Sequence, residues 1–161
     1  MKTQAKEQAQ KLKTKTLKTE ATETTKVINI LVAEDFDLNR SVINLMLEDT
    51  NFVPHFAENG KVACDMYKAE PTKYAAILMD ISMPIMDGYE ATQHIVAYEK
   101  NQTLAHTPVI ALTGHALKND REECIQAGMD DYLTKPVKQA KLLEKLNHWG
   151  GQSESLKTLS A

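Results

Sequence analysis

Short apolar runs and amphipathic stretches alternate through the middle of the chain. Nearly continuous apolar runs are typical of strands buried on both faces, and they predict strands at Val27–Ala33, Phe52–Ala57, Tyr74–Met79, Pro108–Leu112 and Asp131–Leu133. Helical stretches follow the runs, with apolar residues at helical spacing in the first and last of them, a capping Asn59 in the second and a more polar composition in the fourth. They predict a helix that contains Leu38, Val42, Leu45 and Met46, then helices over Asn59–Ala69, Tyr89–Tyr98 and Ala116–Ala127, and a last helix with a stripe of Leu142, Leu143, Leu146 and Trp149.

Five strand-helix units in succession favour one architecture. Parallel strands need crossover connections, and right-handed crossovers place helices on both faces of the sheet. Pro54 cannot donate a ladder hydrogen bond, so the second strand is expected at a sheet edge. Gly128 suits the left-handed position that ends the fourth helix. The predicted fold class is therefore α/β, a doubly wound parallel sheet of five strands with five helices.

The two ends of the chain differ in composition from the middle. Residues 1–26 consist almost wholly of Lys, Thr, Gln, Glu and Ala, so they cannot bury enough apolar surface to offset their ordering entropy. We expect a disordered tail or linker there, with a weak helix or a basic patch for membrane or RNA as alternatives. The Gly150-Gly151 pair and the Ser-rich stretch after it predict a flexible tail at 150–161, which leaves a domain at 27–149.

Composition and charge exclude several classes of function. The 161 residues, 42% apolar and 25% charged, suit one globular domain. The formal charge of -3 is uneven: residues 1–26 hold seven Lys and three Glu, so the remainder has 12 basic and 19 acidic side chains, or -7. An acidic body argues against nucleic acid as its direct ligand.

The remaining composition predicts a cytoplasmic segment without zinc. Cys64 and Cys124 lie far apart in the sequence, and the five His show no metal-ligand spacing, so we expect reduced thiols and no zinc site. No apolar run approaches the ~18 residues of a membrane span, and the Lys-rich start lacks the apolar stretch of a signal peptide.

Polar residues that could carry chemistry follow four of the five predicted strands. Glu34 and Asp35 follow the first strand, Asp80 the third, Thr113 the fourth and Lys135 the fifth. Ligands of such sheets bind outside the carboxyl ends of the strands. All five residues are therefore expected to converge at one edge of the sheet.

The three carboxylates predict a site for a divalent cation. Two like charges ~4 Å apart cost roughly 4 kcal/mol at an effective dielectric near 20, and Mg²⁺ takes oxygen ligands. Asp80 stands alone and is the predicted nucleophile toward phosphorus, whereas the Glu34-Asp35 pair is better suited to hold the ion. Lys135 can supply a positive charge and Thr113 a hydroxyl donor to phosphoryl oxygens. The set predicts a site that receives a phosphoryl group.

The motifs around these residues agree in identity, order and spacing with one family. They are Glu34-Asp35, Asp80-Ile81-Ser82-Met83-Pro84, Met86-Asp87-Gly88, Ala111-Leu112-Thr113 and Lys135-Pro136. Over Ile28–Trp149 the chain resembles the receiver (response regulator) domain of two-component signalling. The local sequence, including Asn39-Arg40, most resembles receivers attached to hybrid sensor histidine kinases. The resemblance implies a flavodoxin-like sheet with strand order 2-1-3-4-5.

The resemblance also implies the chemistry of the site. Receivers take a phosphoryl group from the phosphohistidine of a histidine kinase or histidine phosphotransfer protein, here onto Asp80. Mg²⁺ would bind Asp35, Asp80 and the backbone carbonyl of Ser82, with Glu34 reaching it through water. Thr113 and Lys135 would hold the phosphoryl oxygens, and the peptide bond before Pro136 should be cis.

A conformational switch is implied by the same resemblance. Thr113 would shift inward and Tyr132 would turn from exposed to buried, which changes the surface of the fourth helix, fifth strand and fifth helix for an unknown output protein. Ser82 and His115 occupy positions that tune phosphate lifetime in the family. The resemblance implies that the domain is not a classical enzyme, because it would catalyse only its own phosphorylation and dephosphorylation. It would do so as a separate protein or as part of a hybrid histidine kinase.

Three other functions use similar features. A Mg²⁺-dependent phosphohydrolase of the haloacid dehalogenase type would want a second Asp where Ser82 stands. A flavin-binding module would want a hydroxyl-rich phosphate loop where Glu34-Asp35 stands. A degenerate receiver would bind partners without phosphorylation, although every position of the receiver chemistry is present.

Overall fold

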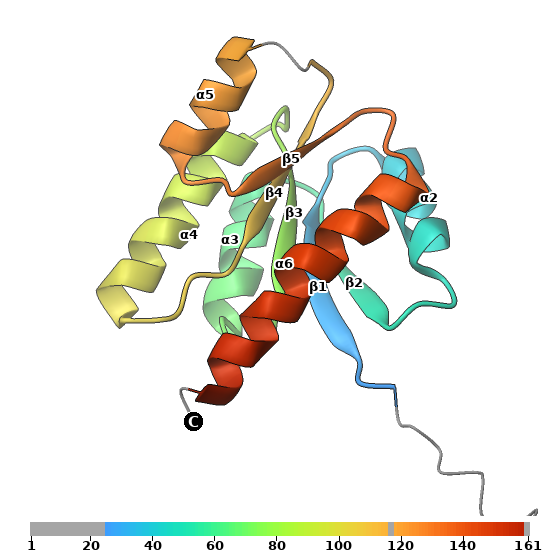
Figure 1. Cartoon of the computed structure of the whole chain (residues 1–161). Coiled ribbons are helices and arrows are strands. Elements are labelled where there is room, and N and C mark those ends of the chain that lie inside the picture. The colour runs from blue at the N-terminus through green and yellow to red at the C-terminus, as the bar shows by residue number, and fades with distance from the viewer. Residues whose placement is uncertain (1–24, 116–117, 160–161) are drawn as a thin grey trace, which may run out of the picture.

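The computed structural model describes residues 25–115 and 118–159, and within them a single parallel sheet forms the centre of the molecule (Figure 1). Its strands are β1 (Ile28–Ala33), β2 (Phe52–Ala57), β3 (Ala76–Asp80), β4 (Val109–Thr113) and β5 (Asp131–Thr134). They lie in the order β2-β1-β3-β4-β5, and every neighbouring pair is parallel. The predicted strand order and class are confirmed, and β2 lies at an edge as Pro54 indicated.

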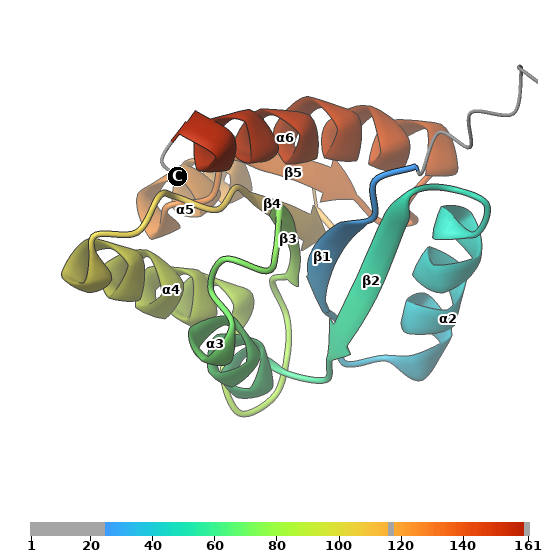
Figure 2. The same ribbon diagram turned by 90° about the horizontal axis from the view of Figure 1, so that it is seen from below.

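Five helices in the described part cover the two faces of this sheet (Figure 2). They are α2 (Asp37–Leu47), α3 (Gly60–Ala69), α4 (Gly88–Gln102), α5 (Lys118–Ala127) and α6 (Gln139–Leu159). One apolar cluster joins the sheet to α3, α4 and α5, and a second joins it to α2 and α6. Strand residues alternate between the two clusters, so Leu31 and Ile77 belong to the first and Ile30 and Leu78 to the second.

The face that α2 buries differs from the stripe that indicated the helix. Ile43 and Leu47 are the buried residues of α2, and Met46 is partly buried against the same cluster. Leu38 and Leu45 are 61% and 62% exposed. The helix has apolar residues on two faces, and only one face can pack on the sheet. The other face remains an exposed apolar surface, which is unusual enough to suggest a use.

The last helix is longer than predicted. The glycine pair at 150–151 was expected to end the compact structure, but α6 continues through both glycines to Leu159. A glycine in a helix interior costs roughly 1 kcal/mol relative to alanine, which weakens a helix without forbidding it. Gly150 is buried, and a Cβ there would lie at an ordinary packing distance of 3.5 Å from Phe52, so α6 still packs against the sheet at this position.

Other sequence expectations lie partly outside the described residues. Residues 1–24 of the predicted N-terminal tail do so, as do residues 116–117, where the fourth helix was expected to begin. Cys64 and Cys124 are buried and free, in line with the expectation of reduced thiols. No helix in the described ranges has the length and hydropathy to cross a bilayer.

Candidate functional site

Three carboxylates meet where β1 and β3 end. One oxygen each from Glu34, Asp35 and Asp80 lies within 4.8 Å of the other two. Glu34 and Asp80 are only 1% and 3% exposed, whereas Asp35 is open to solvent. β1 and β3 are neighbours in the sheet, so residues distant in sequence become adjacent at its carboxyl edge. The predicted convergence of the acidic residues is therefore present.

Lys135 brings a positive charge into this cluster from the end of β5. Its Nζ lies 2.9 Å from Glu34 Oε2 and 3.0 Å from Asp80 Oδ1. Its backbone N–H donates to the carbonyl of Thr113 at 2.7 Å, which fixes the residue beside β4. The Lys135–Pro136 peptide bond is cis, the isomer that the resemblance implied. One ammonium beside three carboxylates leaves the cluster two negative charges in excess.

The pKa values of the paired groups follow from burial and contact. Burial raises the pKa of Asp80 to about 6, and the nearby Glu34 charge adds to this, although the hydrogen bond from Lys135 works in the opposite direction. Burial alone would lower the pKa of Lys135, but its hydrogen bonds to Glu34 and Asp80 outweigh that effect and raise it. Lys135 therefore stays charged, and further positive charge near Asp80 would favour its ionised form.

The chemistry of the donor set fits a hard divalent cation. Three carboxylates offer oxygen ligands of the type that Mg²⁺ prefers, and two of the three are nearly buried. The excess negative charge in a partly desolvated site is the electrostatic condition that such an ion relieves.

Two residues at the start of α2 hold Glu34 in place, and sequence reasoning gave neither a role. Glu34 Oε1 accepts hydrogen bonds from Asn39 Nδ2 and from the backbone N–H of Phe36, each at 3.1 Å. Arg40 Nη1 donates to the Glu34 carbonyl at 2.6 Å, and its other nitrogen contacts Asp37. The sequence did contain a sign of this role, the Asn39-Arg40 pair. It was used only as part of the resemblance to receivers of hybrid sensor histidine kinases.

The loop after Asp80 folds tightly back on the strand. Gly88, the first residue of α4, donates its N–H to the Ile81 carbonyl at 2.9 Å. A Cβ at Gly88 would lie 2.2 Å from the Asp80 carbonyl oxygen, so only glycine can occupy this position without displacement of the backbone. Within the loop, Ile85 has a left-handed φ of 72°, and its side chain is 82% exposed. The Ser82 N–H donates to Asp80 Oδ1 at 3.3 Å.

Thr113 ends β4 beside this cluster, with its hydroxyl turned into its own loop. The hydroxyl donates to the His115 carbonyl at 2.6 Å, and the His115 N–H donates back to Thr113 Oγ1 at 3.1 Å. Tyr132 lies farther back on β5, in register with Ala111, where it is half-buried against the cluster under α3–α5. No hydrogen bond or ion pair among the described residues joins Thr113 or Tyr132 to Asp80.

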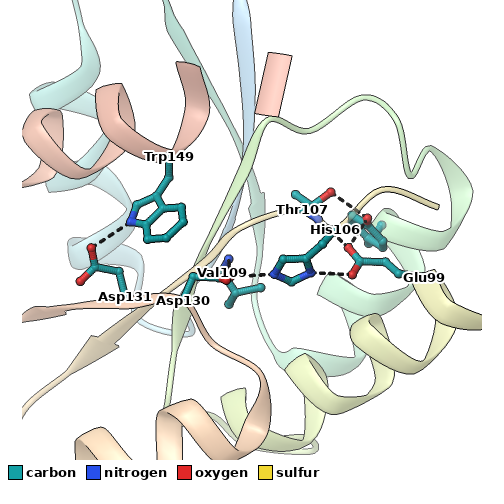
Figure 3. A network of polar contacts seen from close by, with 8 residues as sticks. Glu99, His106, Thr107, Val109, Asp130, Asp131 and Trp149 are labelled. Carbon is teal, nitrogen blue, oxygen red and sulfur yellow. Dashed lines mark hydrogen bonds and ion pairs between the residues drawn. The ribbon is translucent and has the colours of Figure 1, made fainter. Parts of the chain in front are cut away.

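A second polar network lies at the amino ends of the strands, opposite the carboxylate cluster, where β4 begins (Figure 3). His106 Nδ1 lies 2.8 Å from Glu99 Oε2, and its Nε2 lies 2.8 Å from Asp130 Oδ2. Glu99 is buried and also accepts hydrogen bonds from Tyr67 and the Thr107 N–H. The network joins α3, α4 and the starts of β4 and β5, and sequence reasoning did not find it.

Comparison with known proteins gives consistent results. A sequence model of the response regulator receiver domain matches residues 30–147. The chain is 43% identical over 121 residues to hybrid signal transduction histidine kinase I of Dictyostelium discoideum, covering 73% of this chain and 7% of that protein. It is 35% identical over 122 residues to the sensor protein GacS of Pseudomonas syringae pv. syringae, covering 76% of this chain and 13% of that protein. The chain thus spans only a small part of these curated relatives.

Solved structures give the same answer. The receiver domain of sensor histidine kinase PA1611 from Pseudomonas aeruginosa, with a magnesium ion coordinated in its active-site cleft, matches with TM-score 0.69 and 42% identity over 78% of this chain and 98% of that one. The Ssk1 receiver domain of Saccharomyces cerevisiae, crystallised with the histidine phosphotransfer protein Ypd1, matches with TM-score 0.73 and 29% identity over 80% of this chain and 92% of that one. The chain belongs to the response regulator receiver domain family of two-component signalling.

Proposed function

We propose that this domain accepts a phosphoryl group from a phosphohistidine onto Asp80 in a phosphorelay, and that the acyl phosphate changes how a partner binds. The observation that carries the proposal is the meeting of Glu34, Asp35, Asp80 and Lys135 at one edge of the sheet in a chain of the receiver family. We place the domain in the cytoplasm, where it acts alone or within a hybrid histidine kinase.

In the proposed reaction the ionised Asp80 carboxylate attacks phosphorus. A P–O bond forms, the P–N bond of the donor phosphohistidine breaks, and its electron pair returns to the imidazole nitrogen, which takes up a proton. Lys135 already contacts Asp80 and is positioned to neutralise the phosphoryl oxygens. The Thr113 hydroxyl can donate a hydrogen bond to the phosphoryl oxygens once its hydrogen bond to the His115 carbonyl is broken. Hydrolysis of the acyl phosphate by water would return the domain to its starting state, with Ser82 and His115 beside the path of the water.

The proposed cofactor is Mg²⁺. Asp35, Asp80 and the Ser82 carbonyl would hold it directly, with Glu34 reaching it through water. When bound, the ion neutralises the negative charge that the acidic cluster and the phosphoryl group share. Asn39 and Arg40 hold Glu34 in its present orientation, so the site is partly preorganised for this role.

The surface beside Asp80 suits the docking of a phosphodonor protein. The exposed face of α2 carries Leu38, Val42 and Leu45, and Ile85 projects from the loop after β3. A groove of about 180 Å³ runs from Leu38 and Val42 to Pro136 and Val137, with Glu34 and Lys135 also in its lining. An apolar surface continuous with the acceptor can seat a partner and exclude water from the transfer. The groove lies between α2 and the segment that leads into α6, and these two parts of the chain lie side by side in Figure 1.

The proposed output is a population shift in the α5-β5-α6 face. In this structure the Thr113 hydroxyl faces its own loop and Tyr132 is half-buried. A phosphoryl group on Asp80 would draw Thr113 inward and favour burial of Tyr132. The coupling cannot exceed the difference in phosphoryl interaction between the two conformers.

Transfer from a phosphorylated histidine phosphotransfer protein tests the proposal. Wild-type protein should take up radiolabel, and Leu38→Ala with Leu45→Ala should slow transfer by roughly tenfold, because each truncation removes apolar surface that docking would bury, at roughly 25 cal/mol per Å². The same double variant should accept phosphoryl groups from acetyl phosphate at the wild-type rate. Ile125→Ala is the matched control, because Ile125 is 61% exposed on α5. Equal loss in the control, or no acceptance from any donor, would reject the assignment.

A further inference from the structure

A basic groove lies over β5, between α5 and α6. It encloses about 570 Å³, within the range of ligand-sized clefts. Arg121 lines it from α5. Lys138, just before α6, and Lys141 and Lys145, in the first turns of α6, line the other wall. Tyr132 and Asp131 contribute from the strand. Figure 1 shows β5 running between the two helices.

The only acidic group among the residues that line this groove is already satisfied. Lys145 Nζ donates a hydrogen bond to Asp131 Oδ1 at 2.8 Å and also lies 2.8 Å from Oδ2. Trp149 Nε1 donates to Oδ2 at 2.8 Å (Figure 3), and the Tyr132 N–H donates to Oδ1 at 2.8 Å. Burial would raise the pKa of Asp131, but the bonds from Lys145 and Trp149 prevail and lower it. Asp131 is therefore a fixed anion whose charge is neutralised by Lys145. It does not neutralise the other positive charges of the groove.

Two of the remaining cations have no anionic partner within the described ranges. Lys141 pairs with Glu144 at 3.0 Å, next to it on α6. Neither Arg121 nor Lys138 has a carboxylate within ion-pair distance among the residues whose side chains the structure describes, 25–115 and 119–151. A concave surface that holds unpaired positive charge on both walls attracts anionic groups.

The location suits an extended chain. β5 is the last strand in the sheet order, so its outer edge carries backbone groups that an added segment can use. Alternate residues of an extended chain are ~6.6 Å apart, and residues three apart on a helix are ~4.5 Å apart along its axis, a difference that long lysine side chains can span. Acidic side chains at alternate positions would therefore meet Lys138 and Lys141 along one wall, with Arg121 opposite.

From these observations we propose that the groove binds an extended acidic peptide segment of the output protein. This inference rests on the proposed function, since Tyr132, the expected switch residue, lines the groove. A peptide is favoured over nucleic acid because residues 27–161 carry 12 basic and 19 acidic side chains. A long polyanion would be repelled by the rest of that surface, whereas a short segment contacts only the groove.

The test is a titration of the full chain with a labelled dodecapeptide of alternating Glu and Ser. Anisotropy gives the dissociation constant, and backbone amide NMR shifts give the location. Binding should weaken with salt, and the shifts should concentrate at residues 132–134 and 138–145. Arg121→Gln with Lys138→Gln should weaken binding by about threefold to thirtyfold, as expected for two partly exposed ion pairs. Lys61→Gln with Lys100→Gln removes equal charge from α3 and α4 and should change binding by less than about twofold.

Several outcomes would overturn the inference. Equal weakening by both double variants would show general charge attraction instead of a groove. Tighter binding of a twelve-nucleotide single-stranded oligonucleotide at the same shifts would assign the groove to nucleic acid. Absence of peptide binding from the unphosphorylated and acetyl phosphate-treated protein would refute the groove, and would leave the proposed function intact if Asp80 is still phosphorylated. If the peptide binds in the groove but Asp80 is not phosphorylated by acetyl phosphate, the proposed phosphoacceptor function is refuted and the groove remains a peptide site.

Discussion

The His106 network makes a prediction whose size and sign follow from the structure. His106 lies between the carboxylates of Glu99 and Asp130 at 2.8 Å from each. Hydrogen bonds to Asp130 and Glu99 raise its pKa from 6.5 to about 10, although burial opposes them. Folding therefore favours the protonated ring, and His106→Gln removes the bridging cation.

The magnitude comes from linkage and is reduced by solvent. A shift from 6.5 to about 10 corresponds to roughly 5 kcal/mol at 1.36 kcal/mol per pKa unit. The His106 side chain is 42% exposed, so screening reduces the contribution to about 1–2 kcal/mol. Because the folded pKa is the higher one, this stability is complete below pH 6.5 and is lost as pH rises toward 10.

Urea unfolding of wild type and His106→Gln between pH 5.5 and 10 checks this reasoning. The difference in unfolding free energy between the two proteins should be about 1–2 kcal/mol at the acidic end and should shrink steadily above pH 6.5. Using the difference removes the titration of lysines and tyrosines common to both. His94→Gln is the control, because His94 is half exposed and lies 3.7 Å from Glu90 on the same helix, so only a few tenths of a kcal/mol are expected. A difference independent of pH would refute the linkage.

Two further predictions concern the site itself. Gly88→Ala should destabilise the fold by about 1–3 kcal/mol in urea unfolding, because its Cβ would meet the Asp80 carbonyl at 2.2 Å. Gly151→Ala, whose Cβ would meet nothing within 4 Å, should be neutral or stabilising by up to about 1 kcal/mol. Mg²⁺ at ten times its dissociation constant should stabilise the domain by roughly 1.4 kcal/mol and raise Tm. Asp35→Asn should remove most of that shift, and an unchanged shift would contradict the proposed ligand set.

The fold could be predicted because its signals are local and repeated. Continuous apolar runs such as Val109–Leu112 mark strands buried on both faces, and the crossover rule then fixes a parallel sheet. The meeting of Glu34, Asp80 and Lys135 followed from the same rule, since each follows or ends a strand. Residue type and strand position were sufficient for this part of the site.

Features that depend on three-dimensional packing were harder to predict. Leu38 and Leu45 have helical spacing, but spacing alone does not say which of two apolar faces of α2 packs on the sheet. The burial of Gly150 near Phe52 exists only after folding, so the glycine pair was taken as a helix end. The bonds of His106 join residues from separate elements, and no periodicity marks them.

Phosphorylation of the full chain by acetyl phosphate with Mg²⁺ tests the central claim most directly. The account predicts that wild-type protein gains one phosphoryl group by intact mass, that peptide mapping places it on Asp80, and that Asp80→Asn gains none. A phosphoryl group that persists in Asp80→Asn, or its absence from wild-type protein with saturating Mg²⁺, would contradict the assignment of Asp80 as the acceptor.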